Sequence, residues 1–109
     1  MRRGDVVVVS APGDHGKPRP AIVVQSDLFN ETHASIAVCL LTSDIIEAPL
    51  FRLTVEPTAE NGLRSRSQIM VDKVVALRRE RVGKVIGSLD RDTVLRVNRS
   101  LALWLGLGD

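Results

Sequence analysis

The strongest constraint on the fold is a series of short apolar runs, rich in β-branched residues, separated by short connections. The runs span residues 5–10, 19–26, 35–43, 51–57, 67–77 and 81–88. Parallel strands need a crossover of about a dozen residues or more, whereas turn-forming stretches such as "APGDHGKP" join these runs. The sequence therefore predicts antiparallel neighbours in a small, strongly curved sheet or barrel.

The pattern within each run indicates which faces are covered. Runs 19–26 and 35–43 have continuous apolar centres, which predicts strands buried on both faces. Run 51–57 alternates apolar and polar residues, as expected for a strand with one buried and one solvent-exposed face. In run 67–77, Asp72 and Lys73 interrupt the apolar pattern, which predicts one long strand or two strands meeting at a bend.

The last segment changes to a helical period. One face of the predicted helix carries Val94, Val97, Leu101, Trp104 and Leu105. Asp90 is placed to cap its start, Leu89 and Val94 to form a hydrophobic staple, and Gly106 to end it. The fold class is therefore mainly β with a C-terminal α-helix.

Composition limits the class of protein. With 109 residues, 44% hydrophobic and 26% charged, the chain is expected to form one domain over residues 1–109. No apolar run approaches the ~20 residues of a membrane span, and the valines after the start are too few for a signal peptide, so a cytoplasmic protein is expected.

Cys39 is expected to be a buried hydrophobe, and no Cys/His spacing indicates a metal site. Phe29, Phe51 and Trp104 are expected in the core.

The charge pattern and one arginine point toward an anionic ligand. The net charge is only +2, but the basic residues concentrate after residue 63. Pro18 and Pro20 restrict the backbone on either side of Arg19. This arginine therefore loses little backbone conformational freedom when it binds a phosphate. The alternative is a structural arginine paired with Asp5 or Asp72, and local sequence favours neither interpretation.

Four further residues are candidates for chemistry or binding. Thr42 and Ser43 end a buried strand, where hydroxyls either donate to a phosphoryl oxygen or cap a turn. Asp72, in an otherwise apolar strand, either moves a proton or forms an ion pair. His15, on a glycine-flanked loop, is a candidate proton carrier.

The ordered set of motifs resembles a known family. Gly4-Asp5 precedes a valine strand, a loop closes with Arg19-Pro20-Ala21, Leu41-Thr42-Ser43 ends the third strand, Ser67 and Asp72 follow, and Gly87-x-Leu89 leads into the helix. This order resembles the MazF/PemK (Kid) family of toxins from type II toxin–antitoxin systems, over nearly the whole chain.

The resemblance implies a fold, an activity and roles for residues. It implies an SH3-like antiparallel barrel acting as a homodimer, and a metal-independent endoribonuclease, needing no cofactor, that cuts single-stranded RNA by 2′-hydroxyl attack at short motifs. It also implies silencing by a cognate antitoxin, for which we expect an acidic, partly disordered segment. The family's catalytic arginine falls on Arg19, its threonine on Thr42, and an acidic residue of some members on Asp72.

The remaining expectations concern RNA contacts and rival functions. Candidate RNA-binding residues are His15, Lys17, Ser43 and Lys73. A CcdB-like toxin, which poisons DNA gyrase by contact alone, is the alternative, because "LWLGLGD" is superficially similar to the functional tail of that family. An SH3-like binding module without activity is the third possibility. Arg19 and Thr42 in their strand contexts favour RNA cleavage.

Overall fold

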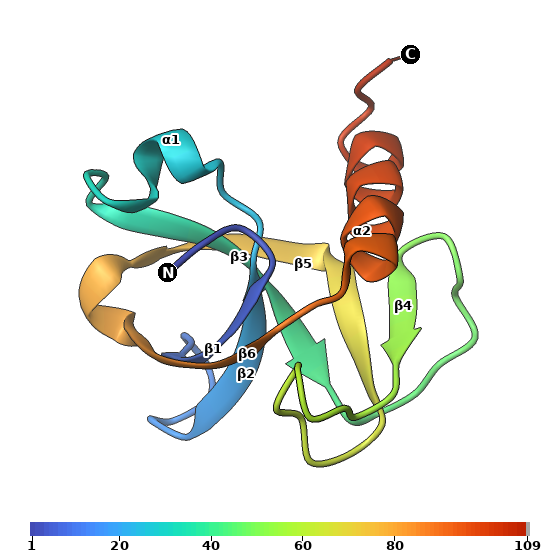
Figure 1. Cartoon of the computed structure of the whole chain (residues 1–109), viewed down its shortest axis with the longest axis horizontal. Coiled ribbons are helices and arrows are strands. Elements are labelled where there is room, and N and C mark those ends of the chain that lie inside the picture. Colours follow the sequence, from blue (N-terminus) through green and yellow to red (C-terminus); the bar gives the residue numbers. More distant parts are fainter. Residues whose placement is uncertain (109) are drawn as a thin grey trace.

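A computed structural model describes residues 1–108 of the chain, and its strands follow the apolar runs closely (Figure 1). The elements in chain order are β1 (Asp5–Ser10), β2 (Pro18–Val23), α1 (Asp27–Asn30), β3 (Ser35–Thr42), β4 (Arg52–Val55), β5 (Ser67–Arg78), a 3₁₀ turn (Arg79–Arg81), β6 (Val82–Ser88) and α2 (Arg91–Trp104).

The six strands form one sheet in the order β4-β5-β3-β2-β1-β6, with every neighbouring pair antiparallel. This confirms the mainly β fold class with a C-terminal helix. The sheet curves strongly, but within residues 1–108 no pairing joins β4 to β6, so it is an open sheet rather than a closed barrel. Its curvature brings the start of β2, the end of β3 and the middle of β6 around one hollow.

Both faces of the central strands are buried, as their continuous apolar sequence predicts. Ala21, Ile22 and Val23 are consecutive in β2, and each is at most 1% exposed. One apolar cluster includes Val97 and Leu101 of α2, and the other is on the opposite face of the same strands. Two layers of apolar side chains therefore hold β2 and β3 rigidly.

β5 is one continuous strand with an irregularity where the sequence predicts a bend. Cys39 of β3 is opposite Val74, whereas Leu41 is opposite Ile69, so four residues of β5, Met70–Lys73, stand against the single Leu40 of β3. The local shift lets the first half of β5 pair with β4 while its second half continues along β3. Asp72 and Lys73 lie within this irregular stretch.

The helix begins as predicted, but the aromatic residues pack less than expected. The Asp90 carboxylate accepts a hydrogen bond from the Thr93 amide at 3.1 Å and caps α2. Phe29 on α1 is 52% exposed, so its expected place in the core is wrong. Trp104, the last residue of α2, is 48% exposed, and its ring centroid lies 5.4 Å from that of Phe51. No helix within residues 1–108 is long and apolar enough to cross a membrane.

Candidate active site

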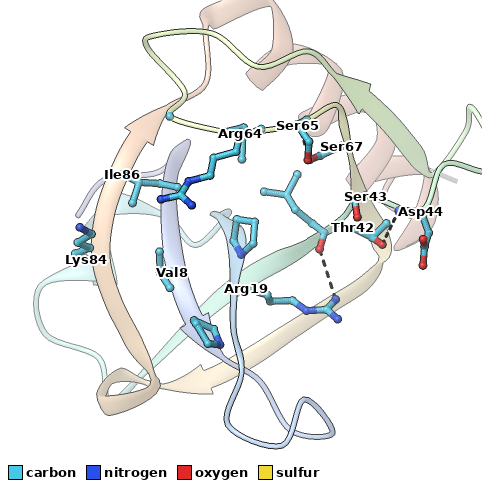
Figure 2. Close-up of a pocket in the computed structure, with 15 residues that line it drawn as sticks. Val8, Arg19, Thr42, Ser43, Asp44, Arg64, Ser65, Ser67, Lys84 and Ile86 are labelled. Carbon is cyan, nitrogen blue, oxygen red and sulfur yellow. Dashed lines mark hydrogen bonds between the residues drawn. The ribbon is translucent and has the colours of Figure 1, made fainter.

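A groove of about 680 Å³ contains Arg19 and Thr42 and is hereafter called the Arg19 groove (Figure 2). Its walls come from the start of β2, the end of β3, the 57–66 loop and β6. Its charged lining residues are Arg19, Asp44, Arg64 and Lys84. The groove is therefore positive on balance, which favours an anionic ligand.

Two successive turns deliver Arg19 to the groove. The Asp14 amide donates to the Ala11 carbonyl at 3.2 Å, and the Lys17 amide donates to the Asp14 carbonyl at 2.9 Å. Gly13 and Gly16 have φ values of 89° and 79°, and His15 has a φ of 52°, a region that L-residues seldom adopt. This backbone makes Asp14 the junction of the two turns.

The junction directs the Asp14 carboxylate to the Arg19 guanidinium. Nε of Arg19 is 2.8 Å from Oδ2 of Asp14, and Nη2 donates to Oδ1 at 3.2 Å. The two side chains are 32% and 19% exposed, so Arg19 is accessible from the groove. Nη1 lies 3.5 Å from the Leu41 carbonyl, toward the end of β3 (Figure 2). The pair holds the guanidinium plane with one edge directed away from Asp14.

Asp14 is the residue that sequence reasoning missed. The ion-pair partners weighed for Arg19 were Asp5 and Asp72, whereas the Asp5 carboxylate accepts from the Arg2 amide. The signal available in the sequence was the position of Asp14 between two glycine-containing turns, five residues before Arg19. Only the turn geometry shows that those five residues fold back on themselves.

Thr42 and Ser43 line the groove beyond Arg19, at the end of β3. The Thr42 hydroxyl accepts a hydrogen bond from the Asp44 amide at 3.1 Å, so it does cap a turn. Because a hydroxyl both accepts and donates, this bond leaves its proton for a ligand. The two interpretations of Thr42 are therefore compatible.

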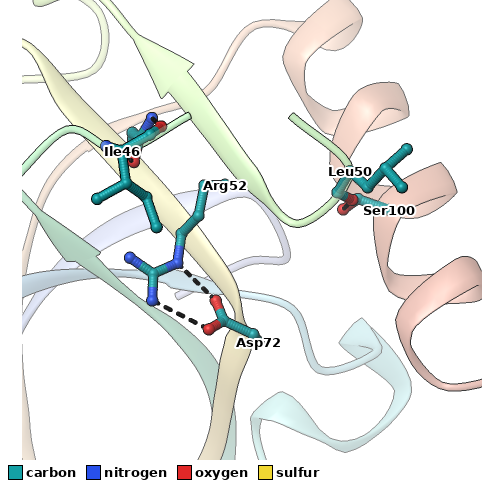
Figure 3. Close-up of polar contacts among 6 residues, drawn as sticks. Ile46, Leu50, Arg52, Asp72 and Ser100 are labelled. Carbon is teal, nitrogen blue, oxygen red and sulfur yellow. Dashed lines mark hydrogen bonds and ion pairs between the residues drawn. The ribbon is translucent and has the colours of Figure 1, made fainter. Parts of the chain in front are cut away.

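Asp72 lies outside the groove lining, contrary to the expected grouping with Arg19 and Thr42. Both of its oxygens accept from Arg52 of β4, at 2.7 Å from Nε and 3.0 Å from Nη2 (Figure 3). The hydrogen bond from Arg52 lowers the pKa of Asp72, and Asp72 in turn raises that of Arg52. The side chains are only 14% and 13% exposed, so the pair is largely enclosed. Of the two interpretations considered, the structure has the ion pair.

Three predicted RNA-binding residues also lie outside the groove lining. His15 and Lys17 are exposed on the β1–β2 loop that carries Asp14, and Lys73 is exposed beside Asp72 on β5. Ser43 alone of the predicted RNA contacts is a lining residue. The structure therefore brings together Arg19, Thr42 and Ser43.

Cys39 is fully buried, as its apolar run predicts. Burial raises the pKa of its thiol to about 12, so it is present as the thiol and acts as a small apolar side chain. Across residues 1–108, no three His, Cys, Asp or Glu side chains gather closely enough to hold a metal ion.

The sequence matches known proteins along almost its whole length. The model of the family described as PemK-like, MazF-like toxin of type II toxin–antitoxin systems matches residues 2–105. A probable endoribonuclease MazF of Mycolicibacterium smegmatis is 39% identical over 108 residues, which are 98% of each chain. Endoribonuclease EndoA of Bacillus subtilis is 25% identical and covers all of this chain and 97% of its own.

Solved structures share the fold. An endoribonuclease bound to its cognate antitoxin, from a mycobacterial species, superposes with a TM-score of 0.82 at 22% identity, over 100% of this chain and 98% of that one. A MazE–MazF complex of Deinococcus radiodurans gives a TM-score of 0.79 at 22% identity, over 99% and 97% of the two chains. The open, curved sheet followed by α2 is thus the architecture of MazF structures.

Proposed function

Because the chain belongs to the PemK-like, MazF-like toxin family of type II toxin–antitoxin systems, we propose that it is an endoribonuclease and that the Arg19 groove is its active site. Its substrate is single-stranded RNA, cut at short sequence motifs. The observation that supports this site is the meeting of one oriented guanidinium and one hydroxyl in a positive groove.

The mechanism uses a nucleophile that RNA itself supplies. The 2′-oxygen attacks the adjacent phosphorus and the bond to the 5′-oxygen breaks, which leaves a 2′,3′-cyclic phosphate and a 5′-hydroxyl. Negative charge builds on the non-bridging oxygens as the new bond forms. Arg19 and Thr42 bind these oxygens, and fixed donors at such a position lower the barrier because they need no reorganisation.

Proton transfer falls to other groups. A guanidinium is too weak an acid to exchange protons near neutral pH, so Arg19 acts electrostatically. Asp14 is a positioning residue, because both of its oxygens are engaged by Arg19. His15, on the loop beside Asp14, receives the 2′-hydroxyl proton through water, because it does not line the groove, and the departing 5′-oxygen takes up a proton from water. His15→Asn, which tolerates the same positive φ, should lower kcat about a hundredfold; an unchanged kcat would remove His15 from the mechanism.

The partners follow from the family and the charge of the groove. We propose that the chain works as a homodimer in the cytoplasm, and that an acidic, partly disordered segment of its antitoxin lies over Arg19, Arg64 and Lys84. Native mass measurement with the antitoxin should find a complex that these three cations stabilise. The gyrase-poison alternative is not favoured, because the matched relatives are endoribonucleases and Trp104 packs against Phe51.

One experiment tests the proposed function. Purified protein is incubated with a long single-stranded RNA in excess EDTA, beside Arg19→Ala and Arg66→Ala variants. Arg66 is the control, because it is exposed, pairs with Glu56 and does not line the groove. The wild type and Arg66→Ala should give the same defined fragments, whereas Arg19→Ala should be about a hundredfold slower or more. RNA left intact by the wild type would refute the nuclease assignment.

A further inference from the structure

The Arg19 groove carries a second group of cations, away from Arg19 and Thr42. Arg64 on the 57–66 loop and Lys84 on β6 both line the groove with exposed side chains. Figure 2 shows Thr42 and Asp44 at one end of the groove and Lys84 at the other, with Arg64 reaching over the side near Ile86. The positive charge therefore extends along the groove beyond the proposed cleavage point.

Arg64 and Lys84 differ from the arginines of the chain that pair with carboxylates. In the described part of the chain, carboxylates pair with Arg19, Arg52 and Arg66 but with neither Arg64 nor Lys84. An unpaired cation in a groove keeps its full charge for a ligand, and it displaces no internal partner when it binds one. The sequence alone treats both residues as members of a general basic stretch.

The loop that presents Arg64 is tightly fixed. Asn61 is 4% exposed; its Oδ1 accepts from the Thr58 and Leu63 amides, both at 3.0 Å, and its Nδ2 donates to the Glu56 carbonyl at 2.9 Å. β6 lies so close that a Cβ added at Gly87 would be 2.3 Å from the Asn61 carbonyl carbon. A side chain presented from such a fixed backbone loses less entropy on binding.

The groove also has an apolar part, to which Val8, Pro20 and Ile86 contribute. Figure 2 shows Val8 between Lys84 and Arg19, so an apolar surface separates the two cationic regions. A phosphate cannot rest favourably on this surface, whereas a ribose or the face of a base can. The groove thus alternates in the manner of a nucleotide chain: an anion-binding point at Arg19 and Thr42, an apolar surface, and a second anion-binding point at Arg64 and Lys84.

We propose that Arg64 and Lys84 form a second phosphate-binding subsite, which holds a phosphate flanking the one that is cleaved. This subsite rests on the proposed function, and it assigns the two residues to substrate affinity rather than to the chemical step. Arg64 binds two phosphate oxygens through its planar fork, and Lys84 adds a point charge.

The test measures binding and turnover separately. The binding probe is the 2′-O-methyl analogue of an RNA that the wild type cuts, titrated at several salt concentrations. Arg64→Ala and Lys84→Ala should each raise Kd and KM about tenfold with kcat unchanged. A lost contact to single-stranded RNA lowers the slope of log Kd against log salt by about 0.7. Arg66→Ala, two residues from Arg64 and outside the groove, should leave Kd and the slope at the wild-type values.

The outcomes separate this proposal from the proposed function. If the wild type cuts RNA but Arg64→Ala and Lys84→Ala match Arg66→Ala in Kd and salt slope, the subsite is refuted and the nuclease assignment stands. A fall in kcat at constant Kd would also refute it, since it would place these side chains in the chemical step. A wild type that neither binds nor cuts RNA would refute both. Both residues are exposed, so circular dichroism should show wild-type folding in each variant.

Discussion

At the scale of single residues, Asp14 fixes the orientation of the Arg19 guanidinium. The carboxylate neutralises part of the guanidinium charge, but it also fixes the plane that a phosphate must meet. An arginine with free rotation would lose side-chain entropy on each binding event. The ion pair with Asp14 therefore orients Arg19 for a phosphate and does not inhibit its binding.

This interpretation predicts the effect of removing the charge at position 14. Asp14→Asn keeps the size of the side chain but holds Arg19 less firmly, so kcat should fall about tenfold while KM changes little. Asp14→Glu should recover part of the loss. Steady-state kinetics on a short RNA measure both constants. A higher kcat for Asp14→Asn would show instead that the carboxylate restrains the enzyme.

A second residue-scale prediction concerns acid stability. The hydrogen bond from Arg52 lowers the pKa of Asp72 from 3.8, so the ionised carboxylate stabilises the fold above pH 3.8, and this contribution is lost as the pH falls through the lowered value. Asp72→Asn should cost about 1–3 kcal/mol at neutral pH, and its deficit relative to wild type should shrink below about pH 4.

Urea unfolding of both proteins across this pH range measures the deficit. Glu56→Gln is the matched control, because its ion pair with Arg66 is exposed and is expected to contribute at most about 1 kcal/mol. A deficit for Asp72→Asn that stays constant from neutral pH to about pH 3 would contradict the role given to the Arg52–Asp72 pair.

The residue scale is also where sequence reasoning reached its limit. Arg19 stands out in the sequence because flanking prolines are a local signal, and Thr42 and Ser43 because a strand end is visible in the pattern; the structure places all three in one groove. Asp14 was missed because its partner depends on two turns whose backbone angles no residue type fixes alone. The partner of Asp72, Arg52, was not predicted because the ion pair joins β4 and β5, and strand register is a property of the folded sheet.

At the scale of elements, short-range patterns were sufficient for most of the architecture. Period-two and continuous apolar runs gave the six strands, and the Asp90 cap gave the start of α2. The exposure of Phe29 and Trp104 was not predicted. An apolar side chain is favoured in the core, but the sequence does not show whether the fold supplies neighbours that cover it. The 57–66 loop was seen only as a turn, although it forms one wall of the groove.

That loop supplies an element-scale prediction. Asn61→Ala removes three hydrogen bonds that hold the 57–66 loop and leaves the Thr58 and Leu63 amides without that acceptor. The free energy of unfolding should fall by about 2–4 kcal/mol, and KM for RNA should rise because Arg64 is no longer held in place. Chemical denaturation and kinetics measure the two effects. Asn98→Ala is the control, because Asn98 is exposed and its side chain accepts one hydrogen bond within residues 1–108, from Arg3; equal losses in the two variants would contradict the role of Asn61.

At the scale of the whole molecule, apolar side chains remain exposed around the end of α2. Leu50 is 66% exposed, and Leu103, Leu105 and Leu107 are each more than half exposed. Large exposed apolar patches are typical of surfaces that meet another protein. Together with the family membership, this predicts a homodimer. Sedimentation at micromolar concentration should give about twice the 11.9 kDa chain mass, and a monomer at that concentration would contradict the prediction.

The proposed role of Arg19 and Thr42 is to stabilise the attack of a ribose oxygen on its own phosphodiester. The most direct measurement compares an RNA that the wild type cuts at one site with the same RNA lacking only the 2′-hydroxyl at that site. The first RNA should give fragments with a 5′-hydroxyl and a 2′,3′-cyclic phosphate, and the second should not be cleaved. Cleavage of the deoxy-substituted RNA, or fragments with 5′-phosphates, would contradict it.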